Sequence, residues 1–230
     1  MAETSVKKTP GRGRFITFEG GEGSGKSTQI KILSERLSAA KLRAVVTREP
    51  GGSPGAEIIR HLVLSGVGKL LGAEAETLLF AAARDDHVRT VIQPALNQGI
   101  WVLCDRFSDS TRAYQGSLGK VSPAVLNAME RVTIGDLKPD LTIILDVPPE
   151  IGMKRASVRR GGGAADRFEA EDRTFHQELR EAYRQIALAE PERCVLIDAT
   201  AEPAIVAANI WAALRDRFFA TRGGSEARSV

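Results

Sequence analysis

The sequence has few cysteines, few histidines and no long apolar run, and each shortage argues against a class of protein. Its two cysteines, Cys104 and Cys194, lie within apolar stretches of the 230 residues. This favours buried reduced thiols over a disulfide framework and predicts a cytoplasmic protein. The three histidines, His61, His87 and His176, are far apart, so no transition-metal site is expected. No apolar run approaches the ~20 residues that a membrane-spanning helix needs, so a membrane is not expected as a partner.

The main part of the chain also lacks an excess of charge of either sign. The net charge of the whole sequence is +3. Residues 1–14 alone hold four basic side chains against one acidic side chain, so residues 15–230 are neutral as a whole. A domain that binds nucleic acid usually carries a basic excess, so no nucleic-acid partner is expected. Residues 1–13, which lack the apolar segment of a secretory signal, are predicted to form a disordered basic arm, and residues 221–230 a disordered tail.

What the chain does have is a phosphate-binding loop. Residues 20–27, Gly-Gly-Glu-Gly-Ser-Gly-Lys-Ser, fit the pattern G-x-x-x-x-G-K-[ST]. The glycines let backbone N–H groups converge on phosphates, Lys26 adds positive charge beside the β and γ oxygens, and Ser27 offers a hydroxyl to Mg²⁺. A merely flexible glycine turn is the alternative, but a strand before the loop and a helix after it favour phosphate binding. The residues predicted to bind ATP are Gly20, Gly21, Glu22, Gly23, Ser24, Gly25, Lys26, Ser27 and Thr28.

Apolar segments place this loop in an α/β fold. They predict five strands, at residues 14–19, 43–47, 100–104, 141–145 and 194–197. Continuous apolar runs such as 100–104 are typical of strands buried on both faces of a parallel sheet. Helices are expected between the strands, including 53–64 and a long one over 73–96. We therefore expect a three-layer P-loop NTPase fold over residues 14–220, with a five-stranded parallel sheet, helices on both faces and a short lid.

Arginines follow several of the predicted strands. Arg48 follows the second strand and Arg106 the third, and four more flank a glycine run: Arg155, Arg159, Arg160 and Arg167. Because the carboxyl ends of parallel strands meet at one crevice, these arginines predict a second anionic ligand facing the triphosphate. An acceptor that is itself a phosphate is already a nucleophile, so charge neutralisation and positioning would suffice. This favours a nucleoside monophosphate kinase, and the lack of an N-K-x-D sequence disfavours a guanine-specific switch.

Seven stretches of the sequence carry a resemblance to a known family. They are residues 18–28, Thr-Arg-Glu-Pro-Gly-Gly at 47–52, Phe-Ala-Ala-Ala-Arg at 80–84, Asp-Arg-Phe at 105–107, Tyr-Gln-Gly at 114–116, Lys-Pro-Asp-Leu-Thr at 138–142 and Leu-Asp-Val at 145–147. Over about residues 15–218 the chain resembles the bacterial thymidylate kinases. The resemblance implies phosphorylation of dTMP to dTDP with ATP and Mg²⁺, which supplies dTTP synthesis in de novo and salvage pathways. It also implies a homodimer.

The resemblance implies roles for residues that would bind the acceptor. Phe80 would stack on the thymine ring, and Arg84, one helical turn later, would donate a hydrogen bond to a base carbonyl. Tyr114 would crowd the 2′ carbon of the sugar and favour deoxyribose. Arg48 and Thr111 would complete the acceptor side. By pattern alone, the two aromatic residues also fit a core position, and Arg84 fits a surface charge.

A second set of residues would act on the phosphates. The resemblance implies that Asp105 holds a water bound to Mg²⁺, beside the Ser27 hydroxyl, and that Arg106 grips the acceptor phosphate. An Asp–Arg ion pair that only closes the strand is the alternative. Glu22 would meet a sugar hydroxyl or the metal-bound water. With Lys26 these residues form the predicted catalytic set, completed by one arginine of the lid.

The glycine run at residues 161–163 predicts a mobile lid over about residues 155–167, with an ordinary solvated loop as the alternative. Gly23 stands where one branch of the thymidylate kinases carries an arginine, so a lid arginine is expected to supply the missing cation. Arg159 is the predicted residue, with Arg155 and Arg160 as competitors. Residues 198–200 are expected to line the adenine side.

Two other kinds of function stay open at this point. Another nucleoside monophosphate kinase or a deoxynucleoside kinase would use the same sheet, and a kinase acting on a hydroxyl would need a carboxylate base, for which Glu49 is a candidate. A P-loop ATPase that acts as a switch is the more distant alternative. It predicts ATP turnover without any small acceptor.

Overall fold

The computed structural model describes residues 11–66, 70–161 and 168–219. Within them five parallel strands form one sheet in the order β2-β3-β1-β4-β5. The strands are β1 (Phe15–Glu19), β2 (Ala44–Arg48), β3 (Trp101–Asp105), β4 (Leu141–Asp146) and β5 (Cys194–Asp198). Each lies within one residue of its predicted bounds, and the predicted fold class is confirmed.

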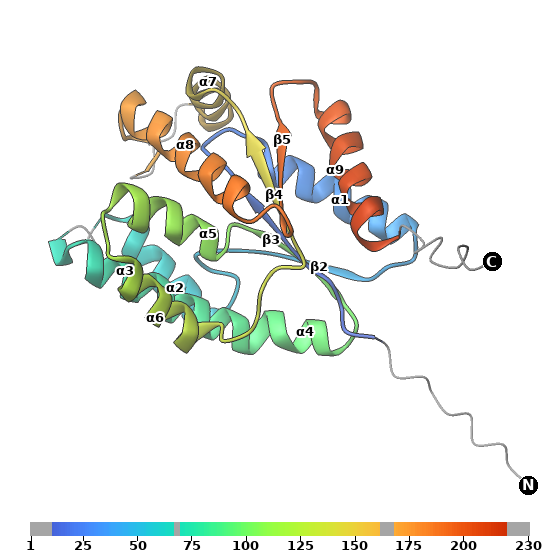
Figure 1. Ribbon diagram of the computed structural model, residues 1–230, viewed down its shortest axis with the longest axis horizontal. Helices are drawn as coiled ribbons and strands as arrows, with labels where there is room; N and C mark the ends of the chain where they lie inside the picture. The colour runs from blue at the N-terminus through green and yellow to red at the C-terminus, as the bar shows by residue number, and fades with distance from the viewer. Residues whose placement is uncertain (1–10, 67–69, 162–167, 220–230) are drawn as a thin grey trace, which may run out of the picture.

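Helices cover both faces of this sheet, because the strands carry apolar side chains on both sides (Figure 1). On one face α1 (Lys26–Ala39) and α9 (Pro203–Phe218) pack on β1, β3 and β4 around Ile16, Phe18 and Leu103. On the other face η2 (Val88–Ile92) and α4 (Gln93–Asn97), which continue α3 (Ala73–His87), belong to one buried cluster, and α8 (Arg173–Ala189) belongs to a second. The result is three layers around a buried sheet.

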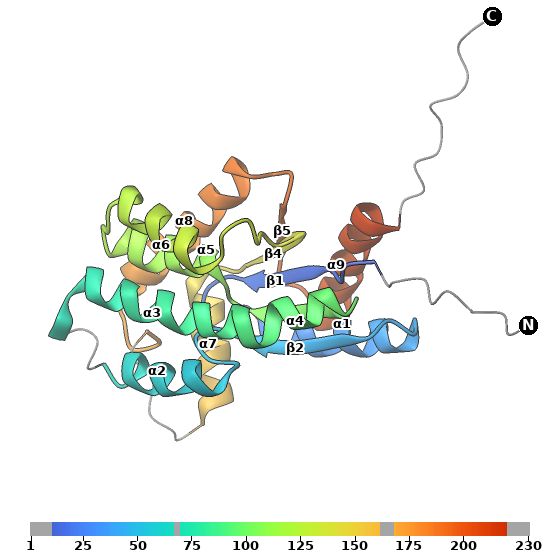
Figure 2. The same ribbon diagram turned by 90° about the horizontal axis from the view of Figure 1, so that it is seen from below.

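The long helix expected over residues 73–96 is present as one continuous run from α3 to α4 (Figure 2). It includes the π-helical turn η2, which lies directly before α4 and its Pro94. Proline has no N–H to donate to the carbonyl one turn earlier, so a regular α-helical pattern cannot continue through it. The remaining helices are α2 (Pro54–Leu64), α5 (Ser108–Thr111), η3 (Arg112–Leu118), α6 (Pro123–Thr133) and α7 (Pro149–Arg160).

Residues 1–10 of the predicted arm, residues 162–167 of the predicted lid and the whole predicted tail, 221–230, lie outside the described residues. The last three residues of the predicted arm are described, and two of them contact the domain. Gly13 donates its N–H to the carbonyl of Leu96 at 2.8 Å, and Arg12 pairs with Asp140 at 3.2 Å. In the described part of the chain, no helix combines the length and the apolar character needed to cross a membrane.

Candidate active site

A cavity of about 350 Å³ opens at the carboxyl ends of the strands, where a doubly wound sheet binds its ligands. The phosphate loop, the ends of β2 and β3, helix α3, and the segment from α5 to η3 contribute to its wall. Of the predicted site residues, those that line it are Glu22, Gly23, Ser24, Gly25, Lys26, Ser27, Thr28, Arg48, Phe80, Arg84, Asp105, Arg106, Thr111, Tyr114 and Arg159. Gly20 and Gly21, at the start of the loop, do not line the cavity, but their carbonyls accept hydrogen bonds from Lys26.

The phosphate loop wraps around the side chain of Lys26. Nζ of Lys26 donates to the carbonyls of Gly20 and Gly21, both at 3.0 Å. Burial and the nearby charge of Arg106 lower the pKa of Lys26. Gly25 has φ 93°, a left-handed conformation that favours glycine, directly before the first residue of α1. The loop thus places a cation and the N-terminus of α1 at one end of the cavity.

Ser27 and Asp105 meet at the metal position that the sequence predicts. Oγ of Ser27 donates to Oδ2 of Asp105 at 2.8 Å, from the first turn of α1 to the end of β3. A hydroxyl and a carboxylate are the oxygen ligands that suit Mg²⁺, and both groups line the cavity beside the loop. The residues present therefore fit a magnesium ion.

Arg106 turns toward the loop from a left-handed backbone position, with φ 69°. Its Nη2 donates to Oε1 of Glu22 at 2.6 Å, and its Nη1 donates to the Gly20 carbonyl at 3.1 Å and to the Tyr183 hydroxyl at 3.0 Å. Burial opposes the ionisation of Glu22, but the charges of Arg106 and Lys26 outweigh it and lower its pKa to about 2. Glu22 is therefore an anion that holds Arg106 beside the loop.

Glu19 is a buried carboxyl beneath this arginine that sequence reasoning missed. Its oxygens accept hydrogen bonds from the N–H of Phe107 at 2.8 Å, from the Ser110 hydroxyl at 2.6 Å and from the Tyr183 hydroxyl at 3.2 Å. Burial, and then the charge of Asp109, raise its pKa to about 7. A charged residue at the end of an apolar strand, directly before the phosphate loop, was the available signal.

Arg84 is held in place on the opposite wall of the cavity. Its Nε donates to Oε2 of Glu49 at 2.7 Å, and its Nη2 donates to Oγ1 of Thr111 at 2.9 Å. Phe80 lies one turn earlier on α3 and is half-buried. The carboxyl of Glu49 is buried and also meets His87. Because both of its oxygens are engaged, Glu49 is better suited to hold Arg84 than to serve as the base of a hydroxyl kinase.

Tyr114 lies between the two walls, on η3. Its ring meets the ring of Phe168 edge-on at 5.0 Å, and the guanidinium of Arg106 lies 5.2 Å from its centroid. Only 9% of the residue is exposed, and the exposed part lines the cavity. Arg48 is more exposed, and it pairs with Glu57 at 2.8 Å.

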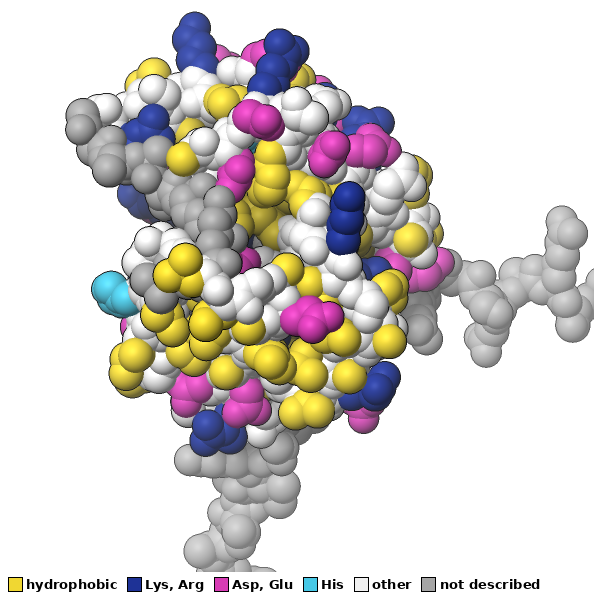
Figure 3. All heavy atoms as spheres, turned by 90° about the vertical axis from the view of Figure 1, so that its left-hand side faces the viewer, with side chains coloured by type: hydrophobic (Ala, Val, Ile, Leu, Met, Phe, Trp, Pro, Cys, Tyr) yellow, Lys and Arg dark blue, Asp and Glu magenta, His cyan; other side chains and the backbone are white. Residues whose placement is uncertain are grey.

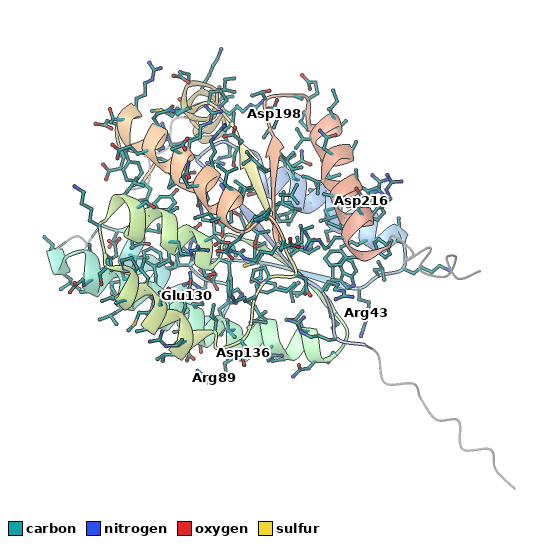
Figure 4. The ribbon with its side chains drawn as sticks, viewed as in Figure 1. Arg43, Arg89, Glu130, Asp136, Asp198 and Asp216 are labelled. Carbon is teal, nitrogen blue, oxygen red and sulfur yellow. The ribbon has the colours of Figure 1, made fainter. Side chains whose placement is uncertain are left out.

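The three candidate lid arginines lie on α7, where two of them share one carboxylate and the third binds elsewhere. Arg159 and Arg160 donate to the two oxygens of Glu169, at 2.7 and 2.8 Å. Arg155 donates to the carbonyls of Ala199 and Thr200, at 2.7 and 3.0 Å. These carbonyls follow Asp198 in the loop after β5 (Figure 4). Of the three arginines, only Arg159 lines the described cavity.

Helix α7 reaches the phosphate loop by direct contact between two backbones. A Cβ atom at Gly23 would lie 1.9 Å from the carbonyl oxygen of Gly152, and a Cβ at Gly152 would lie 2.4 Å from the carbonyl oxygen of Glu22. No side chain fits at either position without a shift of the backbone. The missing side chain at Gly23 is thus what lets α7 contact the loop.

A phosphate loop and an arginine-lined wall that share one cavity define a P-loop kinase acting on nucleotides. Comparison with known proteins identifies the family. The family model named thymidylate kinase matches residues 18–210. The chain is 79% identical to a thymidylate kinase of Nitrobacter hamburgensis over 94% of each chain, and 73% identical to one of Bradyrhizobium diazoefficiens over 96% of this chain and 97% of that one.

A solved structure gives the same answer. The crystal structure of thymidylate kinase from Ehrlichia chaffeensis matches with a TM-score of 0.72 and 33% identity, over 89% of this chain and 100% of that chain. The chain therefore belongs to the thymidylate kinase family. The recognition made from the seven sequence stretches is confirmed.

Proposed function

We infer that this chain, a dTMP kinase by family, brings ATP and dTMP together in the described cavity and transfers one phosphoryl group between them. The observation that carries this inference is the shared cavity itself. Its wall includes the phosphate loop at one end and Phe80 with Arg84 at the other. Lys26 and Arg106 line the space between them, which suits the neutralisation of charge on a transferring phosphoryl group.

The proposed mechanism depends on charge and positioning. The phosphate of dTMP is already a nucleophile, so the protein needs no strong base to activate it. The loop holds the phosphates of ATP through its backbone N–H groups and Lys26, and Arg106 holds the acceptor phosphate. Ser27 and Asp105 hold Mg²⁺, which neutralises charge on the phosphate oxygens when it is bound. Glu22 keeps Arg106 beside the loop through their contact at 2.6 Å.

On the acceptor side, Phe80 stacks on the thymine ring and Arg84 donates to a base carbonyl, while Thr111 fixes the guanidinium plane of Arg84. Tyr114 packs against the sugar. Its position supports this role, since it is almost fully buried and rigidly packed against Phe168. A ribose hydroxyl would meet a fixed ring there, so deoxyribose is preferred.

Arg159 supplies the further cation of the transition state. Its presence in the cavity wall supports this choice over Arg155 and Arg160. Its side chain is 61% exposed, so its ion pair with Glu169 is of a kind that contributes little stability and is readily exchanged.

The chain acts as a homodimer, through an apolar patch on three neighbouring helices. The patch consists of Ile58 on α2, Leu78 on α3 and Val132 on α6, whose exposed fractions are 74%, 51% and 77%. These helices lie at the lower left of Figure 1, and hydrophobic side chains gather over the lower half of that face in Figure 3. Exposed apolar patches of this kind commonly mark subunit interfaces.

A charge in the patch tests the dimer. Ile58→Glu is expected to shift the mass measured by light scattering from dimer to monomer. Leu188→Glu, on α8, is the matched control because Leu188 is 73% exposed and lies outside the patch. A wild-type protein that is monomeric at micromolar concentration would exclude the dimer.

We also place the protein in the cytoplasm, with neither nucleic acid nor membrane among its partners. The two cysteines support a reducing compartment, since both are free and buried. Burial raises the pKa of Cys194 to about 12, which keeps this thiol protonated and unreactive at neutral pH.

An acceptor screen tests the proposed function as a whole. ATP-to-ADP conversion is measured with dTMP, thymidine, UMP or dCMP as the sole acceptor. Turnover is expected to be fastest with dTMP. A preference for thymidine would indicate a deoxynucleoside kinase, and a preference for UMP or dCMP another nucleoside monophosphate kinase. ATP turnover that is independent of any acceptor would indicate a P-loop ATPase switch.

A further inference from the structure

Behind Arg84 lies a chain of buried polar contacts that the proposed function does not use. Oε1 of Glu49 lies 3.0 Å from Nδ1 of His87, and Nε2 of His87 lies 2.6 Å from Oγ1 of Thr47. The other oxygen of Glu49 accepts from Nε of Arg84. His87 is fully buried, so it touches neither nucleotide. The contacts connect β2, the turn after it and the last turn of α3 to the wall of the cavity.

We propose that His87 is a positioning residue for base selection: it anchors Glu49, which fixes the guanidinium plane of Arg84 against the acceptor base. The proposal rests on the proposed role of Arg84 in binding the base. It assigns a function in specificity to a residue that lies outside the cavity.

The carboxylate of Glu49 fixes how one side of the imidazole is used. A carboxylate only accepts hydrogen bonds, so Nδ1 of His87 carries a hydrogen and donates it to Glu49. Nε2 pairs with the Thr47 hydroxyl, which can either donate or accept a hydrogen bond. The Asp–His pairs that fix an imidazole in other sites use the same logic, with the carboxylate selecting the tautomer.

The protein leaves room for this imidazole by using a glycine. A Cβ atom at Gly52 would lie 2.6 Å from Nε2 of His87 and 2.4 Å from Oγ1 of Thr47. Gly52 also has φ 85°, which other residues rarely adopt. The turn after β2 therefore closes over His87 and holds the ring against Thr47.

The orientation of the guanidinium plane matters for base selection, because the group is rigid and all its N–H donors change direction together. Nε and Nη2 of Arg84 donate to Glu49 and Thr111, so two positions of the rigid, planar guanidinium are held. The direction of Nη1 is then determined. A thymine carbonyl can accept from such a donor, whereas the amino group at the equivalent position of cytosine is itself a donor. Loosening the anchor should therefore reduce the preference for dTMP over dCMP.

The test compares His87→Leu, which removes both ring nitrogens, with His87→Asn, whose amide nitrogen can replace Nδ1. His87→Leu is expected to raise KM for dTMP about tenfold and to narrow the kcat/KM ratio of dTMP to dCMP, while KM for ATP stays unchanged. His87→Asn should restore most of the ratio. In the Arg84→Ala background His87→Leu should change the ratio no further, because it acts through Arg84.

Thr47→Val gives a second route if His87→Leu fails to fold. It keeps the imidazole but removes the hydrogen-bond partner of Nε2, so the ratio of kcat/KM for dTMP to that for dCMP should fall in the same direction by a smaller factor. An unchanged ratio in His87→Leu, or equal rises in KM for ATP and dTMP, would overturn the proposal. If Arg84→Ala narrows the ratio and His87→Leu does not, only this inference fails. If Arg84→Ala leaves the ratio unchanged, the proposed role of Arg84 fails as well.

Discussion

Glu19→Gln should make the protein more stable, and the gain should grow with pH. The carboxyl of Glu19 is buried beneath Arg106, where desolvation raises its pKa from 4.5 to about 7. A group with a raised pKa contributes its full stability below pH 4.5, and that contribution is lost as the pH rises through 7. Glutamine keeps the shape and an acceptor for the N–H of Phe107, and its amide can donate to Ser110, so no proton has to be lost.

The size of the effect follows from the shift. A difference of one pKa unit corresponds to about 1.4 kcal/mol, so the change in the pKa of Glu19 corresponds to about 3 kcal/mol between pH 4.5 and pH 8. The assay is urea unfolding of both proteins across this range. The free energy of unfolding of the variant, minus that of the wild type, should rise by about this amount.

Glu22→Gln is the matched control, because the pKa of Glu22 is lowered to about 2 by Arg106 and Lys26. Its contribution is fully present above pH 4.5 and is lost only as the pH falls through 2, so its difference curve should stay flat between pH 4.5 and pH 8. A difference curve for Glu19→Gln that stays flat between pH 4.5 and pH 8 would refute the reasoning.

Three predictions concern turnover. Lys26→Ala should lower kcat by about 10²-fold or more in a protein that unfolds at the wild-type temperature; near-normal turnover would remove Lys26 from the mechanism. Arg159→Ala should lower kcat by ~10³-fold or more with nearly unchanged affinity for dTMP by calorimetry, whereas Arg155→Ala and Arg160→Ala should keep most activity. Tyr114→Ala should narrow the kcat/KM preference for dTMP over its ribose counterpart, and an unchanged ratio would contradict packing against the sugar.

The sequence predicted those features that depend on local patterns. The position of the phosphate loop between β1 and α1 was predictable, because an apolar segment, a loop with four glycines and a helical pattern follow one another directly in the sequence. The strand bounds were predictable because a buried parallel strand shows as an uninterrupted apolar run. The family resemblance indicated which residues form the cavity wall. That those after β2 and β3 lie in one cavity was predictable because the carboxyl ends of parallel strands meet in one place.

Features that depend on distant contacts could not be predicted in this way. Glu49 and His87 are 38 positions apart, and nothing in either local sequence indicates that they meet. Arg155 and Arg159 are one helical turn apart on α7, yet one of them binds the loop after β5 and the other lines the cavity. Their roles differ because of where neighbouring segments lie, which the helical pattern does not encode.

The glycine pair between α7 and the phosphate loop restricts how this protein can evolve. An arginine at position 23 would need the space that the carbonyl of Gly152 occupies, at 1.9 Å from the first side-chain atom. A loop arginine and a closely seated α7 therefore exclude each other in this backbone. With Arg159 as the proposed extra cation, a lineage that moved this cation from α7 into the loop would first have to retract the helix that carries Arg159, and would lose the proposed cation before it gained the new one. No single substitution can replace an arginine on α7 by an arginine in the phosphate loop. We therefore expect close relatives of this protein to keep the same one of these two arrangements.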